Sequence, residues 1–130
     1  DTLFDRADHV AVYAPLTEST RGMVDADALD RLGPESVVVN VGRGPVVDAD
    51  ALLDALETDG IKAAGLDVLE AEPPEDDPLV GRSDTVITPH AAWYSEDART
   101  DLNESAADDI AAVFGGETPD GRVDPDADWL

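Results

Sequence analysis

The chain of 130 residues contains no cysteine and only one lysine, Lys62. Without cysteine, neither a disulfide framework nor a thiolate metal site can form, and we expect no bound metal. No apolar run reaches about 18 residues, the length that a membrane-spanning helix needs. No secretory signal is visible either. These absences favour a cytoplasmic protein without a membrane partner.

Positive charge is also scarce, with 8 basic residues against 31 acidic ones and a formal net charge of -23. Such a field repels nucleic acid and anionic lipid, so neither is an expected partner. An acidic surface in which arginine replaces lysine favours adaptation to a high-salt cytoplasm, where salt screens self-repulsion. A specific role in binding a partner through acidic residues remains the alternative.

The chain does contain short apolar segments that alternate with amphipathic ones. Period and turn residues predict strands at 9–14, 37–41, 63–69 and 85–88. The nearly continuous β-branched run 37–41 is typical of a strand buried on both faces. Helices are expected at 25–32, 48–58 and 95–114, where Asp25, Asp48 and Ser95 can act as N-caps.

This alternation predicts an α/β fold with a mostly parallel sheet and flanking helices. Four strands are few for this class, so the pattern indicates the second half of a Rossmann-like dinucleotide-binding domain. The phosphate turn G-x-G-x-x-G is absent. Gly42-x-Gly44 does not qualify, because Val47 occupies the position of the third glycine.

Three polar residues, Arg43, Glu72 and His90, each follow one of these strands. The carboxyl ends of parallel strands form the edge where ligands bind, and there a cation and an imidazole can hold an acidic substrate and move a proton. Each residue also has a structural interpretation: Arg43 could pair with an aspartate, Glu72 could be solvated, and His90 could be a loop residue. Asp67 lies within a predicted strand, where a buried carboxylate needs partners or a ligand.

Three blocks resemble the D-isomer-specific 2-hydroxyacid dehydrogenases: residues 38–48 (VVNVGRGPVVD), 65–73 (GLDVLEAEP) and 88–93 (TPHAAW). The family's arginine, glutamate and histidine fall on Arg43, Glu72 and His90. The stretch 88–96 resembles a narrower branch, the C-terminal-binding protein corepressors. A haloarchaeal source would suit the composition. Tyr13 and Gly42 depart from the common family residues, and both changes look tolerable.

The resemblance implies hydride transfer between a nicotinamide cofactor and a small 2-keto or D-2-hydroxy acid. Arg43 would hold the substrate carboxylate, His90 would exchange the proton, and Glu72 would hydrogen-bond His90. As in the corepressor-like branch, Trp93 would line the substrate pocket with Arg43 and His90, which would favour a keto acid with an apolar side chain. The cofactor would be NAD, with NADP not excluded. Its implied contacts are Ala14, Pro15, Thr20, Val41, Gly42, Arg43 and Asp67.

The resemblance further implies that this chain is the C-terminal part of a longer protein that forms a homodimer. Residues 1–93 would be the second half of the NAD-binding domain, and 94–130 a helix and tail that return to a substrate domain. The upstream half and that domain would be absent, so the fragment itself is expected to be inactive. The alternatives are an NAD(H)-sensing corepressor-like module and an α/β fragment without activity.

Overall fold

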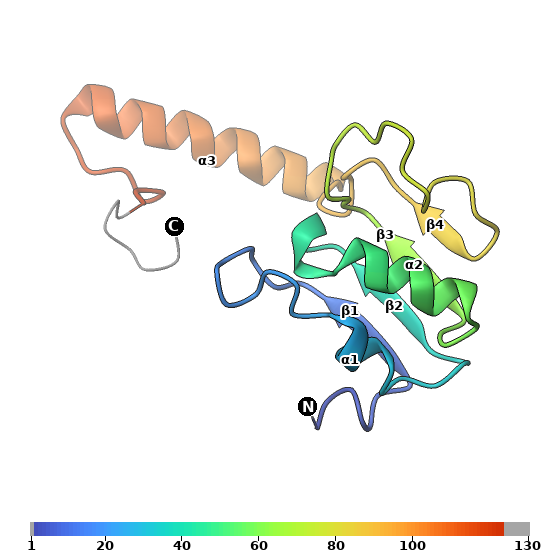
Figure 1. The fold of residues 1–130 in the computed structure, drawn as a ribbon. Helices are drawn as coiled ribbons and strands as arrows, with labels where there is room; N and C mark the ends of the chain where they lie inside the picture. Colours follow the sequence, from blue (N-terminus) through green and yellow to red (C-terminus); the bar gives the residue numbers. More distant parts are fainter. Residues whose placement is uncertain (1, 124–130) are drawn as a thin grey trace. The chain divides into compact units, whose positions relative to one another are not determined.

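The structure is a computed structural model that describes residues 2–123. It divides into two compact units, Asp1–Ala92 and Trp93–Leu130, and Figure 1 shows the elements of each. The first unit contains the sheet and its helices, and the second contains one long helix. Each unit is described by itself.

The first unit is built on four parallel strands in the order β1-β2-β3-β4. This arrangement confirms the α/β, Rossmann-like class that the alternating pattern predicts. Strands and helices follow one another along the chain as β1 (His9–Val12), α1 (Ala26–Leu29), β2 (Val37–Asn40), the 3-10 helix η1 (Gly44–Val46), α2 (Ala49–Glu57), β3 (Ala63–Leu66) and β4 (Thr85–Ile87).

The expected N-caps start the helices of this unit. The Asp25 carboxylate accepts the backbone N–H of Ala28 at the start of α1. Asp48 does the same for Ala51 at the start of α2. Each cap satisfies one of the N–H groups that a helix leaves unpaired at its first turn.

Both helices lie on the same face of the sheet (Figure 1). The strand order advances in one direction, and right-handed crossovers that advance in one direction place their helices on one side. That face holds the core, in which strand residues such as Val38 and Leu66 are buried with Leu29 and Leu52 of the helices.

The opposite face of the sheet is only partly covered. Val37 and Val39 of β2 are half-buried, whereas Val38 and Asn40 are buried. The expectation that this strand is buried on both faces is therefore wrong for this structure. The physical reason is that β-branched residues favour strands on buried and on partly exposed faces alike. Composition alone therefore does not show whether one face of the sheet is covered or both.

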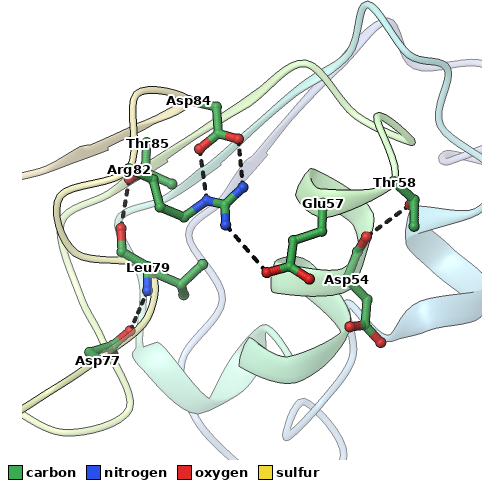
Figure 2. Close-up of polar contacts among 8 residues, drawn as sticks. All are labelled: Asp54, Glu57, Thr58, Asp77, Leu79, Arg82, Asp84 and Thr85. Carbon is green, nitrogen blue, oxygen red and sulfur yellow. Dashed lines mark hydrogen bonds and ion pairs between the residues drawn. The ribbon is translucent and has the colours of Figure 1, made fainter.

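The connection from β3 to β4 is a long loop fastened to α2 by one arginine, as Figure 2 shows. Nε and Nη2 of Arg82 each lie 2.8 Å from a carboxylate oxygen of Asp84. Its Nη1 also lies 3.6 Å from Oε1 of Glu57, the last residue of α2. The hydroxyl of Thr85 donates to the carbonyl of Leu79 at 2.7 Å. These contacts fix the start of β4, the strand that leads to His90.

The second unit contains α3 (Glu96–Gly115), which Ser95 caps by accepting the N–H of Ala98. Gly116 ends the helix with φ at 77°, a left-handed conformation that glycine adopts without steric cost. None of its side chains is buried, and Phe114 is 89% exposed. No helix among residues 2–123 is long and apolar enough to cross a membrane. The expected tail after Val123 lies outside the described residues.

Candidate active site

The site is centred on a hydrogen bond between His90 and Glu72. Nδ1 of the imidazole lies 2.7 Å from Oε2 of the carboxylate. The other oxygen, Oε1, accepts the backbone N–H of Leu69 at 2.9 Å. The hydrogen bond from His90, and then that from Leu69, lower the pKa of Glu72 despite partial burial and the nearby Asp67 charge. A carboxylate so placed fixes the imidazole orientation and leaves Nε2 on the opposite side of the ring.

The backbone at His90 has a rare conformation. Its φ of 51° lies in the left-handed region, which a residue with a Cβ seldom adopts. Its N–H donates to the carbonyl oxygens of Asp67 and Thr88, each at 3.0 Å. Such backbone conformations persist where surrounding contacts hold them, and they are concentrated at functional sites.

Asp67 supplies most of those surrounding contacts. Its Oδ1 accepts the Thr88 hydroxyl at 2.5 Å and the Ala91 N–H at 2.8 Å. Its Oδ2 accepts the Ala92 N–H at 2.8 Å. Burial would raise the pKa of Asp67, but these hydrogen bonds and the His90 charge outweigh it and lower the pKa. The buried carboxylate thus has partners in the turn that carries His90.

Arg43 lies on a neighbouring turn whose backbone is held by a buried side chain. Asn40 is 1% exposed, and its amide donates to the Arg43 carbonyl while accepting the Gly42 N–H, both at 3.0 Å. The guanidinium is exposed and donates to the Gly42 carbonyl at 2.8 Å. Within residues 2–123 it forms no ion pair, so the alternative that Arg43 pairs with an aspartate is not seen there.

The loop after β1 contains Ala14, Pro15 and Thr20, three of the residues expected to contact the cofactor. Thr20 has a clear structural role, since its hydroxyl donates to the Pro15 carbonyl at 2.6 Å and accepts the Thr17 N–H at 2.8 Å. The loop also approaches Gly42 closely, because a Cβ built there would lie 2.6 Å from the Ala14 carbonyl oxygen. Glycine at position 42, where many family members have alanine, is therefore accommodated here, whereas a Cβ would require this loop to shift.

A largely apolar cavity of about 330 Å³ lies beside the His90–Glu72 pair. The sheet contributes Ile87, and the loops contribute three prolines around the polar groups. An apolar wall excludes water and strengthens electrostatic interactions at its edge. The lining residues are Asp67, Leu69, Glu72, Pro73, Pro74, Ile87, Thr88, Pro89 and His90.

The structure thus brings Glu72 and His90 into direct contact, with Asp67 bound to the same turn. Arg43 and Val41 lie at the end of the neighbouring strand β2, where the Arg43 guanidinium donates to the Gly42 carbonyl. Trp93 belongs to the second unit, where its ring packs edge-on against Tyr94 at 5.6 Å between centroids. Its role in a substrate pocket stays a prediction.

Sequence reasoning missed Asn40 and Thr88, the side chains that hold the two turns. For Asn40 a signal exists, because an amide interrupts the valine run 37–41. A polar residue inside a buried strand needs partners, which is the argument that selects Asp67. Thr88 gives no such signal, since threonine is common in strands.

With the geometry known, comparison with characterised proteins defines the class. Residues 1–92 match the model of the D-isomer specific 2-hydroxyacid dehydrogenase, NAD binding domain. The chain belongs to this family, and the matched part is a domain whose cofactor is NAD. This confirms the family resemblance, although neither the corepressor-like branch nor a haloarchaeal source is tested by it.

Particular relatives agree with this assignment. A glyoxylate reductase of Korarchaeum cryptofilum (strain OPF8) is 40% identical over 124 residues, which cover 95% of this chain and 37% of the relative. D-lactate dehydrogenase with NAD+ from Lactobacillus jensenii is 28% identical with a TM-score of 0.83, over 95% of this chain and 41% of that one.

A third relative has the other cofactor. The D-isomer specific 2-hydroxyacid dehydrogenase from Xanthobacter autotrophicus Py2 in complex with NADPH and MES is 37% identical with a TM-score of 0.78. The match covers 95% of this chain and 51% of that one. This chain therefore spans about two-fifths to one-half of the length of the proteins it resembles.

Proposed function

We propose that the complete gene product interconverts 2-keto acids and D-2-hydroxy acids with a nicotinamide cofactor. The observation that carries this proposal is the 2.7 Å contact between His90 Nδ1 and Glu72 Oε2 at the carboxyl edge of the sheet. A histidine oriented by a carboxylate is a common general acid and base near neutral pH. The cavity beside it gives a bound molecule access to the pair.

Each residue of the trio has a defined role in this proposal. Arg43 binds the substrate carboxylate through parallel hydrogen bonds from its exposed guanidinium. His90 donates a proton from Nε2 to the substrate carbonyl oxygen during reduction and takes it back during oxidation. Glu72 accepts a hydrogen bond from Nδ1–H and fixes the orientation of the imidazole.

The apolar cavity beside the His90–Glu72 pair supports a site for the nicotinamide half of the cofactor. When bound, the reduced nicotinamide supplies the two electrons as a hydride. The ends of β1, β2 and β3 would hold this half through Ala14, Pro15, Thr20, Val41, Gly42, Arg43 and Asp67. The chain has no G-x-G-x-x-G turn for the pyrophosphate, so we expect the remaining contacts from other parts of the complete protein.

The proposed substrates are small 2-keto acids, consistent with relatives named for glyoxylate and D-lactate. Trp93 would favour an apolar substrate side chain. We also propose that the complete protein is a homodimer. We further propose that it works in a high-salt cytoplasm, which the net charge of -23 supports. The isolated 130-residue chain would be inactive, because it lacks the phosphate-binding turn.

The decisive experiment measures NADH and NADPH oxidation by the complete gene product with a panel of 2-keto acids. His90→Gln should abolish turnover while leaving cofactor affinity within about threefold, since glutamine cannot donate a proton as an acid. His9→Gln is the matched control and should keep full activity, because His9 lies at the opposite end of β1. If none of the keto acids on the panel is reduced, the proposed enzymatic function is rejected.

A cofactor-sensing module without turnover is the remaining alternative, suggested by the corepressor-like stretch 88–96. It predicts tight NADH binding by the complete gene product together with no oxidation in the same panel. Titration of the isolated chain with NADH at high salt tests the inactive fragment separately. Sub-millimolar binding by that chain would show that its own residues suffice for cofactor binding.

A further inference from the structure

The two halves of the proposed site are in contact through the backbone at Gly44 and Leu69. Gly44 directly follows Arg43 and is buried. A Cβ at Gly44 would lie 2.0 Å from the carbonyl oxygen of Leu69, 2.2 Å from its carbonyl carbon and 2.7 Å from the nitrogen of Glu70. The η1 turn therefore rests on the backbone of the loop that carries Glu72.

Leu69 of that loop is also held by the Glu72 carboxylate. The N–H of Leu69 donates to Oε1 of Glu72 at 2.9 Å, and Oε2 of Glu72 bonds to His90. Leu69 is therefore fixed on one side by Glu72, while its carbonyl lies against Gly44. A displacement of this peptide would move Glu72 and, with it, the imidazole.

The other side of the contact is equally constrained. Asn40 is buried and binds both the Gly42 N–H and the Arg43 carbonyl, so the turn that precedes Gly44 has little freedom to retreat. Two further bonds anchor η1 to residues 22–24: the Gly22 N–H donates to the Pro45 carbonyl at 2.9 Å, and the Val24 N–H donates to the Val46 carbonyl at 3.1 Å. Neither backbone can yield without breaking bonds to a side chain at the site.

We propose that Gly44 is a positioning residue that sets the separation between Arg43 and the Glu72–His90 pair. The proposal rests on the function proposed above. A substrate held by its carboxylate on Arg43 and protonated by His90 must span that separation. A misplacement of about 1 Å costs on the order of 10²-fold in rate, so one added methyl group at position 44 has a large expected effect.

The test compares Gly44→Ala with Gly33→Ala in the complete gene product. Gly33 is the matched control, because a Cβ there meets nothing within 4 Å. Gly44→Ala should lower kcat/KM for a 2-keto acid about 100-fold, and Gly33→Ala should leave it within about threefold. A folded Gly44→Ala protein within about threefold of the parent would overturn the proposal.

A double-mutant cycle with Arg43→Lys separates positioning from a general loss of stability. If Gly44 acts through the placement of Arg43, then Gly44→Ala should cost less than about tenfold in the Arg43→Lys background. Losses that multiply in full would mean that the two positions act independently, and would contradict the proposal.

A measurement that needs no turnover keeps this proposal distinct from the proposed function. If the parent reduces no keto acid, that function fails, and NMR decides the role of Gly44. Gly44→Ala should shift the Leu69 amide and the His90 ring resonances, whereas Gly33→Ala should not. If Gly44→Ala does not fold, Glu72→Gln should shift the Gly44 amide and leave Gly33 unchanged. If the resonances do not shift in either experiment, the contact between Gly44 and Leu69 does not position the site, and the proposal is rejected.

Discussion

The backbone N–H of His90 donates to the carbonyl oxygen of Asp67 at 3.0 Å. The side chain of Asp67 binds the two following N–H groups, those of Ala91 and Ala92. One buried residue thus holds three consecutive amides, and it does so around a histidine with φ at 51°. The orientation of His90 depends on Asp67 as well as on Glu72.

Asp67→Asn should loosen this turn. Asparagine keeps one acceptor oxygen but points an NH₂ group toward a backbone N–H, which leaves a buried donor without a partner. We expect a loss of roughly 1–3 kcal/mol in the free energy that opens the turn. Amide hydrogen exchange at Ala91 and Ala92 measures it directly. Asp54→Asn on the exposed side of α2 is the control, and equal exchange in both variants would contradict the role given to Asp67.

The Glu72–His90 bond should make the free energy of unfolding depend on pH in the acid range. The pKa of Glu72 is lowered in the folded chain, so its stabilising contribution is fully present above the ordinary glutamate pKa of 4.5 and is lost as pH falls through the lowered pKa. Glu72→Gln should therefore be less stable than the parent at pH 6, with the gap narrowing below pH ~4. Urea unfolding at several pH values checks this, and a constant gap would speak against it.

Arg82 should matter more to stability than Lys62, although both form ion pairs. Arg82 is 23% exposed and binds Asp84 through two nitrogens. Lys62 pairs with Glu35 at 59% and 83% exposure, where solvent screens the interaction. We expect Arg82→Gln to lower the free energy of unfolding more than Lys62→Gln does. Equal costs would show that the bidentate geometry adds nothing.

The net charge of -23 should make stability depend strongly on salt. Repulsion among 31 acidic side chains falls as the Debye length shrinks from about 10 Å at 0.1 M to about 3 Å at 1 M. The Tm should therefore rise markedly between 0.1 M and 3 M KCl, with most of the rise below about 1 M. A Tm that is insensitive to KCl would refute adaptation to high salt and favour the acidic-partner interpretation.

The sequence was a good guide to the elements of the first unit, and its errors have physical causes. Capping residues and β-branched runs fix local structure, so the start of α2 at Asp48 and the strand at 37–40 were found. The third strand was expected through Leu69, but β3 ends at Leu66. Its apolar residues continue to residue 69, yet the chain leaves the sheet because Asp67 binds the 88–92 turn.

The candidate site was likewise predicted only in part from the sequence. Residue type and position after a strand were enough to select Arg43, Glu72 and His90, because parallel strands bring such positions to one edge. Which of them would touch depended on loops, and the sequence offered no measure of loop geometry. The structure joins Glu72 to His90 directly and brings the backbone next to Arg43, at Gly44, against the loop that carries Glu72.

By itself, the sequence determined the parallel α/β fold, the family and the residue types available for proton transfer and carboxylate binding, because periodicity, capping and motif spacing are local properties of the chain. Only the tertiary structure decided that Asp67 holds the turn at His90, that Asn40 holds the turn at Arg43, and that Gly44 meets Leu69. The side-chain bonds of Asp67 and the contact of Gly44 with Leu69 join residues 21 to 25 positions apart, whereas the bonds of Asn40 are local. Burial makes each of these bonds necessary only once the sheet has formed.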